Sequence, residues 1–210
     1  MRAPPRLQFL TLDDAPLGHV RQAELACAGG VRWVQLRAKG LGFGEWVALA
    51  RDVVAACRAH GAICVINDSP VVAVESGADG VHLGRADASP AEARRLLGDS
   101  TWVGVTLNQP GDLVRLSAGR PDYVGVGPFR ATATKPGHAP VHSDDSLREL
   151  VAAASLPAYV IGGLRLDDLQ AVRASGARGA AVSSALASAP DLRAAAAEWV
   201  RATAACWGDA

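Results

Sequence analysis

The chain of 210 residues has few cysteines, few aromatic side chains, no excess of charge of either sign and no long apolar run. Its four cysteines form no CxxC pair and stand among apolar neighbours, which predicts reduced, buried thiols and argues against a zinc site. Aromatic residues make up 5%, too few for a base-stacking surface, and 21 basic residues balance 21 acidic ones. No apolar segment approaches the roughly 20 residues that a membrane span requires, and the first residues lack a signal-peptide core. We therefore expect a cytoplasmic protein with neither nucleic-acid nor membrane partners.

What the chain does contain is a recurring glycine followed closely by a short apolar run. The glycines in this position are Gly30, Gly61, Gly77, Gly98, Gly119 and Gly176. Glycine just past a helix end adopts the left-handed conformation without cost, so each one predicts the end of a helix before a strand. With two further apolar runs, strands are expected at 8–10, 31–34, 63–66, 81–83, 102–105, 123–126, 158–161 and 180–182. Helices are expected at 14–29, 43–60, 68–76, 89–97, 110–118, 144–154, 166–175 and 190–205.

Eight alternating strands and helices without a linker predict one α/β domain over residues 1–210, a (β/α)8 TIM barrel. An open doubly wound sheet is the alternative, and the complete count of units favours the barrel. The segment 128–143 interrupts the alternation with a long irregular stretch, which is typical of a functional loop.

Polar residues or glycines follow nearly every predicted strand. They are Gln35, Arg37, Lys39, Asn67, Asp68, Asp87, Thr106, Thr132, Thr134, Lys135, Gly162, Gly163, Ser183 and Ser184. In a barrel these positions meet at the carboxyl ends of the strands, where barrel enzymes place their active sites. Carboxylates from neighbouring strands suit Mg²⁺, cations beside them suit a diphosphate, and glycines and serines after the last two strands suit a monophosphate. The rim therefore predicts a site for two phosphorylated ligands, and no side chain presents itself as a covalent catalyst.

Each of these elements also has a structural interpretation. Gln35 with Arg37 could be a pair that only stabilises the barrel, and Asn67-Asp68 could cap the helix that follows. Asp87 could be a turn residue, and His82, inside an apolar run, is better interpreted as a hydrogen-bonded core histidine. The functional interpretation is favoured because these residues all fall at strand ends.

Several segments in succession resemble the thiamine phosphate synthase family. They are the segments 34–39 (VQLRAK), 66–68 (IND), 77–84 (GADGVHLG), 122–128 (DYVGVGP), 132–136 (TATKP) and 161–164 (IGGL). The resemblance implies a TIM barrel that joins hydroxymethylpyrimidine diphosphate to hydroxyethylthiazole phosphate, releasing diphosphate. It implies small-molecule substrates and a Mg²⁺ cofactor, and it leaves homo-oligomerisation open.

The resemblance also implies a role for each rim residue. Arg37, Lys39, Thr106 and Lys135 would be catalytic and, with Gln35 and Asn67, would bind the pyrimidine diphosphate. Asp68 and Asp87 would ligate Mg²⁺. The thiazole phosphate would be bound by Thr132, Thr134, Gly163, Ser183 and Ser184.

The sequence departs from the family pattern at three places. Thr106 stands where serine is usual, Arg130 stands where an aromatic residue is common, and the segment 141–144 lacks the usual glycine. Two related functions remain as alternatives, a thiazole tautomerase-like enzyme and a non-catalytic regulator that binds the thiazole phosphate. The pair Asp68 and Asp87 argues against the tautomerase, which would need no Mg²⁺.

Overall fold

The computed structural model describes residues 4–117, 119–131 and 140–208 and shows eight parallel strands closed into a barrel. The strands are β1 (Leu7–Leu10), β2 (Trp33–Leu36), β3 (Ile63–Asn67), β4 (Gly80–Leu83), β5 (Trp102–Leu107), β6 (Tyr123–Val126), β7 (Ala158–Ile161) and β8 (Gly179–Val182). Each pairs with the next, and β1 pairs with β8 to close the ring, for example Gln8 with Ala181. The predicted (β/α)8 barrel is confirmed, and the open sheet is excluded.

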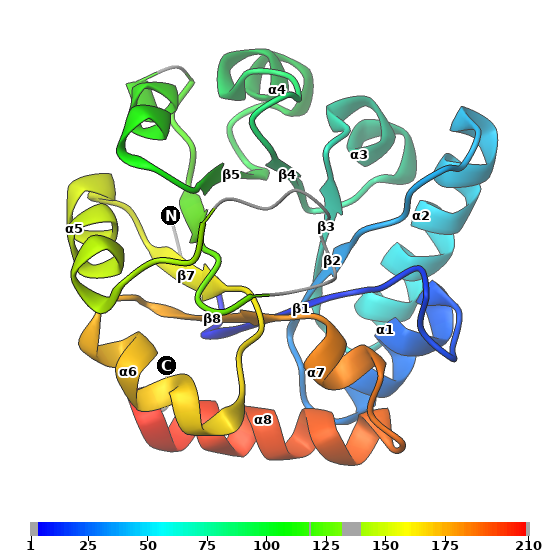
Figure 1. Ribbon diagram of the computed structural model, residues 1–210. Coiled ribbons are helices and arrows are strands. Elements are labelled where there is room, and N and C mark those ends of the chain that lie inside the picture. The colour runs from blue at the N-terminus through cyan, green and yellow to red at the C-terminus, as the bar shows by residue number, and fades with distance from the viewer. Residues whose placement is uncertain (1–3, 118, 132–139, 209–210) are drawn as a thin grey trace.

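Helices surround this ring of strands (Figure 1). The α-helices are α1 (His19–Ala28), α2 (Phe43–Ala59), α3 (Pro70–Ser76), α4 (Pro90–Leu97), α5 (Asp144–Ala154), α6 (Leu169–Ala174), α7 (Ser184–Ala187) and α8 (Leu192–Trp207). Two 3-10 helices, η1 (Pro110–Ser117) and η2 (Leu166–Asp168), complete the described elements. Two of the predicted signals mark helix boundaries. Ser89, just before Pro90, caps the start of α4 because its side chain accepts a hydrogen bond from the Glu92 N–H, and Gly77 ends α3 with φ of 68°.

Some predicted boundaries were wrong for local reasons. The helix expected at 14–29 begins only at His19, because the chain first forms a loop containing Pro16 and Gly18. The helix expected at 110–118 is the 3-10 helix η1, whose Asp112 carboxylate binds the backbone N–H groups of Asn108 and Gln109. The strand expected at 31–34 is shifted to Trp33–Leu36. The helix expected at 166–175 is divided between η2 and α6. The last predicted helix is preceded by the short α7.

Three aromatic rings fill the amino-terminal half of the barrel interior. Trp33 packs edge-on against Tyr123 and Tyr159 with ring centroids 4.8 Å apart in both pairs, and all three side chains are fully buried. Gly104 makes room for them, since a Cβ there would lie 2.1 Å from the Tyr123 ring. This aromatic plug leaves the carboxyl-terminal half of the barrel to polar side chains.

The four cysteines are free and buried, as predicted. The hydrogen bond with the Cys57 thiol, and to a smaller extent burial, raise the pKa of the Cys27 thiol. Within the described parts of the chain, no helix is long and apolar enough to cross a membrane.

Candidate active site

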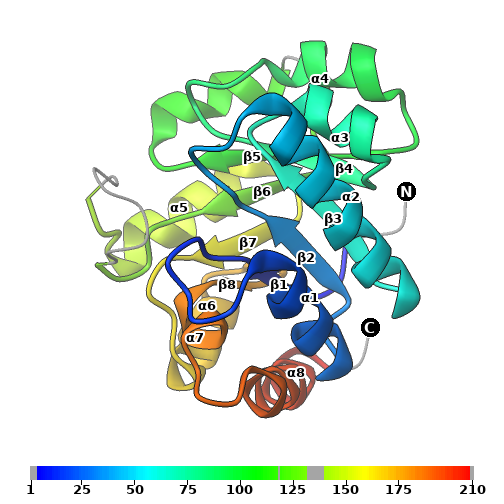
Figure 2. The ribbon, with the colours of Figure 1, turned by 90° about the vertical axis from the view of Figure 1, so that its right-hand side faces the viewer.

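The predicted site residues that the structure describes lie at or just after the carboxyl ends of the strands. Gln35 lies within β2, Arg37 and Lys39 follow it, Asn67 ends β3, and Asp68 comes next. Asp87 follows β4, Thr106 lies near the end of β5, Gly163 follows β7, and Ser183 and Ser184 follow β8. Thr132, Thr134 and Lys135 lie outside the described residues. Figure 2 shows the barrel from the side, with the β1–α1 and β2–α2 connections at the same end.

The two described cations of the site each face a carboxylate. The Lys39 ammonium forms an ion pair with Oδ2 of Asp68, and Nη1 of Arg37 lies 3.7 Å from Oδ2 of Asp13. The Lys39 side chain is half-exposed, whereas that of Arg37 is 16% exposed. Lys39 therefore reaches from the end of β2 across to the residue that follows β3, whereas Arg37 faces the residues that follow β1.

Asp68 and Asp87 converge above Gly84. A Cβ added at Gly84 would lie 2.9 Å from Oδ2 of Asp87 and 4.0 Å from Oδ1 of Asp68, so glycine keeps the space between the carboxylates open. Oδ2 of Asp87 accepts a hydrogen bond of 2.6 Å from the Gly84 N–H, and the Asp68 N–H donates to the His82 carbonyl. Burial, and then the neighbouring Asp68 carboxylate, raise the pKa of Asp87.

Two hard oxygen donors beside a lysine suit a divalent cation that also takes water and phosphate oxygens. Mg²⁺ usually binds proteins through one or two carboxylates in this way. No group of three or more acidic, histidine or cysteine side chains that could hold a metal occurs among the residues described. Asp68 and Asp87 are the described residues that could hold such a cation.

The structure tests the structural interpretations of Asn67-Asp68 and of Asp87. Ser69, not Asn67 or Asp68, caps α3, because its Oγ accepts a hydrogen bond of 3.2 Å from the Val72 N–H. Asp87 does stabilise a turn, because its Oδ2 accepts a hydrogen bond from the Gly84 N–H, and its carboxylate also faces that of Asp68.

His82 is the hydrogen-bonded core histidine that the sequence predicted. It is 8% exposed, its Nδ1 lies 3.2 Å from the Tyr123 hydroxyl, and its Nε2 lies 3.0 Å from Oγ1 of Thr106. A Cβ at Gly125 would lie 3.1 Å from the imidazole ring. His82 thus links the aromatic plug to Thr106, a connection that the sequence pattern did not indicate.

The ends of β7 and β8 offer small residues and a hydroxyl. Gly162 and Gly163 have φ of 110° and 62°, and a Cβ at Gly163 would lie 2.9 Å from the Ala131 carbonyl oxygen. Oγ of Ser183 is buried without a hydrogen-bond partner in the described structure, and so is Oε1 of Gln35. Buried polar atoms of this kind ordinarily bind a ligand or water.

Arg130, one of the departures from the family pattern, has a structural partner. Its Nε donates a hydrogen bond of 2.9 Å to Oδ2 of Asp168, and its Nη2 forms an ion pair with Oδ1. Asp168 is buried and also accepts a hydrogen bond of 2.8 Å from the Arg165 N–H. The arginine therefore fastens the residues that follow β6 to the segment between β7 and α6.

This pair predicts a pH-dependent contribution to stability. The Arg130 guanidinium lowers the pKa of Asp168, so the pair stabilises the fold above the ordinary aspartate pKa of about 3.9 and loses this effect as the pH falls through the lower folded-state value. Asp168→Asn should lower the free energy of unfolding at pH 7 and less so in high salt, because the arginine partner is half-exposed; urea denaturation measures the change. The exposed neighbour Asp167 supplies the control, Asp167→Asn. A loss at pH 3 as large as at pH 7 would contradict the ionic role.

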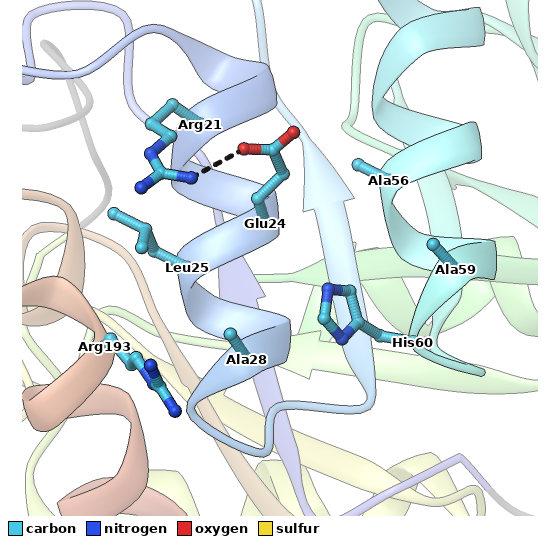
Figure 3. Close-up of a pocket in the computed structure, with 8 residues that line it drawn as sticks. All are labelled: Arg21, Glu24, Leu25, Ala28, Ala56, Ala59, His60 and Arg193. Atoms are coloured by element: carbon cyan, nitrogen blue, oxygen red, sulfur yellow. Dashed lines mark hydrogen bonds and ion pairs between the residues drawn. The ribbon is translucent and has the colours of Figure 1, made fainter.

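A separate pocket lies on the outside of the barrel, between α1, α2 and the start of α8 (Figure 3). It has a volume of about 430 Å³ and is lined by Arg21, Glu24, Leu25, Ala28, Ala56, Ala59, His60 and Arg193. Arg21 and Glu24 form an ion pair of 2.9 Å across one turn of α1. None of its lining residues is a predicted site residue, so this pocket is distinct from the candidate active site.

Thr11, Asp13 and His19, from the β1–α1 connection, also contact the candidate site, and sequence reasoning missed them. The sequence did contain a signal for Thr11 and Asp13. They are the first and third residues after β1, as Arg37 and Lys39 are the first and third residues after β2.

Comparison with known proteins identifies the family. The family model described as thiamine monophosphate synthase matches residues 11–186. The thiamine-phosphate synthase of Laribacter hongkongensis is 42% identical over 174 residues, covering 83% of this chain and 82% of the relative. That of Bacteroides fragilis is 35% identical over 190 residues, covering 88% of this chain and 93% of the relative. The solved structure of thiamine phosphate pyrophosphorylase from Pyrococcus furiosus superposes with a TM-score of 0.85 at 25% identity, covering 96% of each chain. The chain belongs to the thiamine monophosphate synthase family.

Proposed function

We propose that this chain joins hydroxymethylpyrimidine diphosphate to hydroxyethylthiazole phosphate, forming thiamine phosphate and releasing diphosphate. The observation that carries the proposal is the convergence of Asp68 and Asp87 over Gly84 with the Lys39 ammonium paired to Asp68. Hard oxygen donors next to cations suit a diphosphate bound together with a divalent cation. Relatives that match most of this chain carry the name of this activity.

In the proposed reaction the pyrimidine methylene loses diphosphate before it gains the thiazole. The bond from the methylene carbon to oxygen breaks, its electron pair leaves with the diphosphate, and the aminopyrimidine delocalises the resulting cation. The thiazole nitrogen then donates its electron pair to that carbon. No covalent bond to the enzyme forms, which agrees with a rim that offers electrostatic stabilisation and positioning.

The chain's own residues divide between the two ligands. Asp68 and Asp87 would hold Mg²⁺, which when bound neutralises charge on the diphosphate. Arg37 and Lys39 would bind diphosphate oxygens, with the planar guanidinium able to contact two of them. Gln35, Asn67 and Thr106 would orient the pyrimidine, and the His82 hydrogen bond directs the Thr106 hydroxyl.

The thiazole phosphate would lie at the ends of β7 and β8. Gly163 lets the backbone approach a phosphate closely, and Ser183 and Ser184 begin the connection from β8 into α7. Barrel enzymes commonly hold a phosphate at these strand ends. Thr132, Thr134 and Lys135 keep their proposed ligand roles from the family resemblance.

One assay tests the proposal. Purified protein is mixed with both substrates and Mg²⁺, and thiamine phosphate and diphosphate are quantified, with each substrate omitted in turn. Equal amounts of the two products, formed only with both substrates and only with Mg²⁺, support the proposal. Thiazole phosphate isomerisation without condensation would favour the tautomerase alternative, and binding without turnover would favour a regulator.

The two phosphate sites should be separable by mutation. Ser184→Phe should raise the KM for thiazole phosphate about tenfold or more, because the ring would occupy the proposed phosphate position and remove a hydrogen bond to a charged group. The KM for the pyrimidine diphosphate should stay within about twofold on the same reasoning, since Ser184 makes no proposed contact with that substrate. Ser188→Phe, at the exposed end of α7, is the matched control. Equal increases in both KM values would place the boundary between the two sites elsewhere.

A further inference from the structure

Three polar side chains of the β1–α1 segment form a connected cluster: Thr11, Asp13 and His19. The imidazole of His19, the first residue of α1, spans the other two. Its Nδ1 lies 2.9 Å from Oγ1 of Thr11, and its Nε2 lies 3.2 Å from Oδ1 of Asp13. Thr11 is fully buried, and the His19 side chain is 13% exposed. The cluster is therefore an ordered part of the barrel rim.

Oγ1 of Thr11 and Oδ1 of Asp13 also accept hydrogen bonds from the segment that follows β2. The Arg37 N–H donates a hydrogen bond of 3.1 Å to Oγ1 of Thr11, and the Lys39 N–H donates one of 3.1 Å to Oδ1 of Asp13. Oδ2 of Asp13 lies 3.7 Å from Nη1 of Arg37. The cluster thus fixes the backbone at both cationic residues and provides the counter-charge to one of them.

The chemistry of the partners orients the imidazole. An ionised carboxylate only accepts hydrogen bonds, so Nε2 must carry the proton that is donated to Asp13. Oγ1 of Thr11 accepts from Arg37 and has its hydroxyl proton to donate, which Nδ1 of a neutral ring can accept. A chain of directed hydrogen bonds then runs from the Arg37 backbone through Thr11 and His19 to Asp13.

The segment that carries the cluster is itself fixed to α1. Gln22, fully buried, donates hydrogen bonds from its Nε2 to the Leu12 and Leu17 carbonyls at 2.8 and 2.6 Å. Its Oε1 accepts one from the Leu12 N–H at 2.9 Å. Because α1 holds this segment in place, the cluster can act as a support for the residues after β2.

We propose that Thr11, Asp13 and His19 are positioning residues that hold Arg37 and Lys39 in place to bind the diphosphate of the pyrimidine substrate. This inference rests on the proposed function, which assigns the two cations to that diphosphate. His19 acts through Thr11 and Asp13 and does not itself contact the substrate. Loss of its ring removes the donor to Asp13 and the acceptor of the Thr11 hydroxyl proton, and lets the segment from Arg37 to Lys39 move.

The test compares substitutions at His19 with a histidine outside the cluster. His19→Ala removes both contacts, whereas His19→Gln keeps an amide N–H where Nε2 faces Asp13. His60→Ala is the matched control, because His60 is exposed at the end of α2. For each variant, KM is measured for both substrates, and the affinity for inorganic diphosphate with Mg²⁺ is measured by calorimetry.

His19→Ala should raise both the KM for pyrimidine diphosphate and the Kd for inorganic diphosphate about fivefold to tenfold, the effect of one or two lost hydrogen bonds. The KM for thiazole phosphate should change less than about twofold, since those contacts belong to other strands. His19→Gln should recover most of the diphosphate affinity, and His60→Ala should match the wild type. Thr11→Val, which removes only the hydroxyl, should show the same selective loss and serves if His19→Ala does not fold.

Three results would overturn the inference. They are an unchanged diphosphate affinity in both His19→Ala and Thr11→Val, equal increases in the KM for both substrates, or no recovery in His19→Gln. Failure of the proposed function is distinguishable, because it shows as absence of turnover by the wild type. Inorganic diphosphate binding still reports on the positioning role in that case.

Discussion

Replacing Asp68 or Asp87 by asparagine should lower kcat at least about 100-fold, the scale of several kcal/mol of charge stabilisation that a bound divalent cation contributes. Each variant keeps the shape of the side chain and removes one of the anionic oxygens that converge above Gly84. Excess Mg²⁺ should restore activity only in part, since one ligand is lost. The measurement is steady-state turnover across a Mg²⁺ titration, together with calorimetric Mg²⁺ binding.

Two companion variants make this result specific. Asp52→Asn, on the exposed side of α2, should leave turnover unchanged. Gly84→Ala introduces a Cβ 2.9 Å from Oδ2 of Asp87 and should weaken Mg²⁺ binding without removing any charge. Turnover without metal in the wild type, or near-normal activity in both asparagine variants, would refute the assignment of this carboxylate pair.

Arg37→Ala should lower kcat about 100-fold, comparable to the loss of one preorganised donor to developing negative charge. Charge on the diphosphate grows as the bond to the methylene carbon breaks, so the guanidinium contributes most in the transition state. Arg37→Lys should recover only part of this, because an ammonium cannot contact two oxygens in a plane. Single-turnover kinetics with saturating substrates measure the effect on the chemical step.

The control for Arg37 is Arg201→Ala, an exposed arginine on α8. Arg37→Ala should also weaken the binding of inorganic diphosphate, whereas the variant should still bind thiazole phosphate. An Arg37→Ala variant that alters only the KM for thiazole phosphate would assign this arginine to the other ligand.

Local signals in the sequence were sufficient to predict the barrel and most of its rim. Glycine after many of the helices, for example Gly77 with its left-handed backbone, and caps such as Ser89 depend on neighbouring residues only. The positions of Arg37, Asp68 and Thr106 followed from the rule that parallel strands end at one face.

Contacts between distant residues could not be predicted in the same way. The Arg130–Asp168 pair joins positions 38 residues apart, and the His82–Thr106 hydrogen bond joins positions 24 apart. No local periodicity specifies either pairing. The 3-10 character of η1 was missed for a local reason, since the Asp112 carboxylate binds N–H groups of the preceding loop and competes with regular helix formation there.

The aromatic plug of Trp33, Tyr123 and Tyr159 closes the amino-terminal half of the barrel. A closed barrel with a filled interior is a packed core and not a passage, so ligands exchange at the carboxyl-terminal mouth. Both substrates would then arrive, and both products depart, through the same opening.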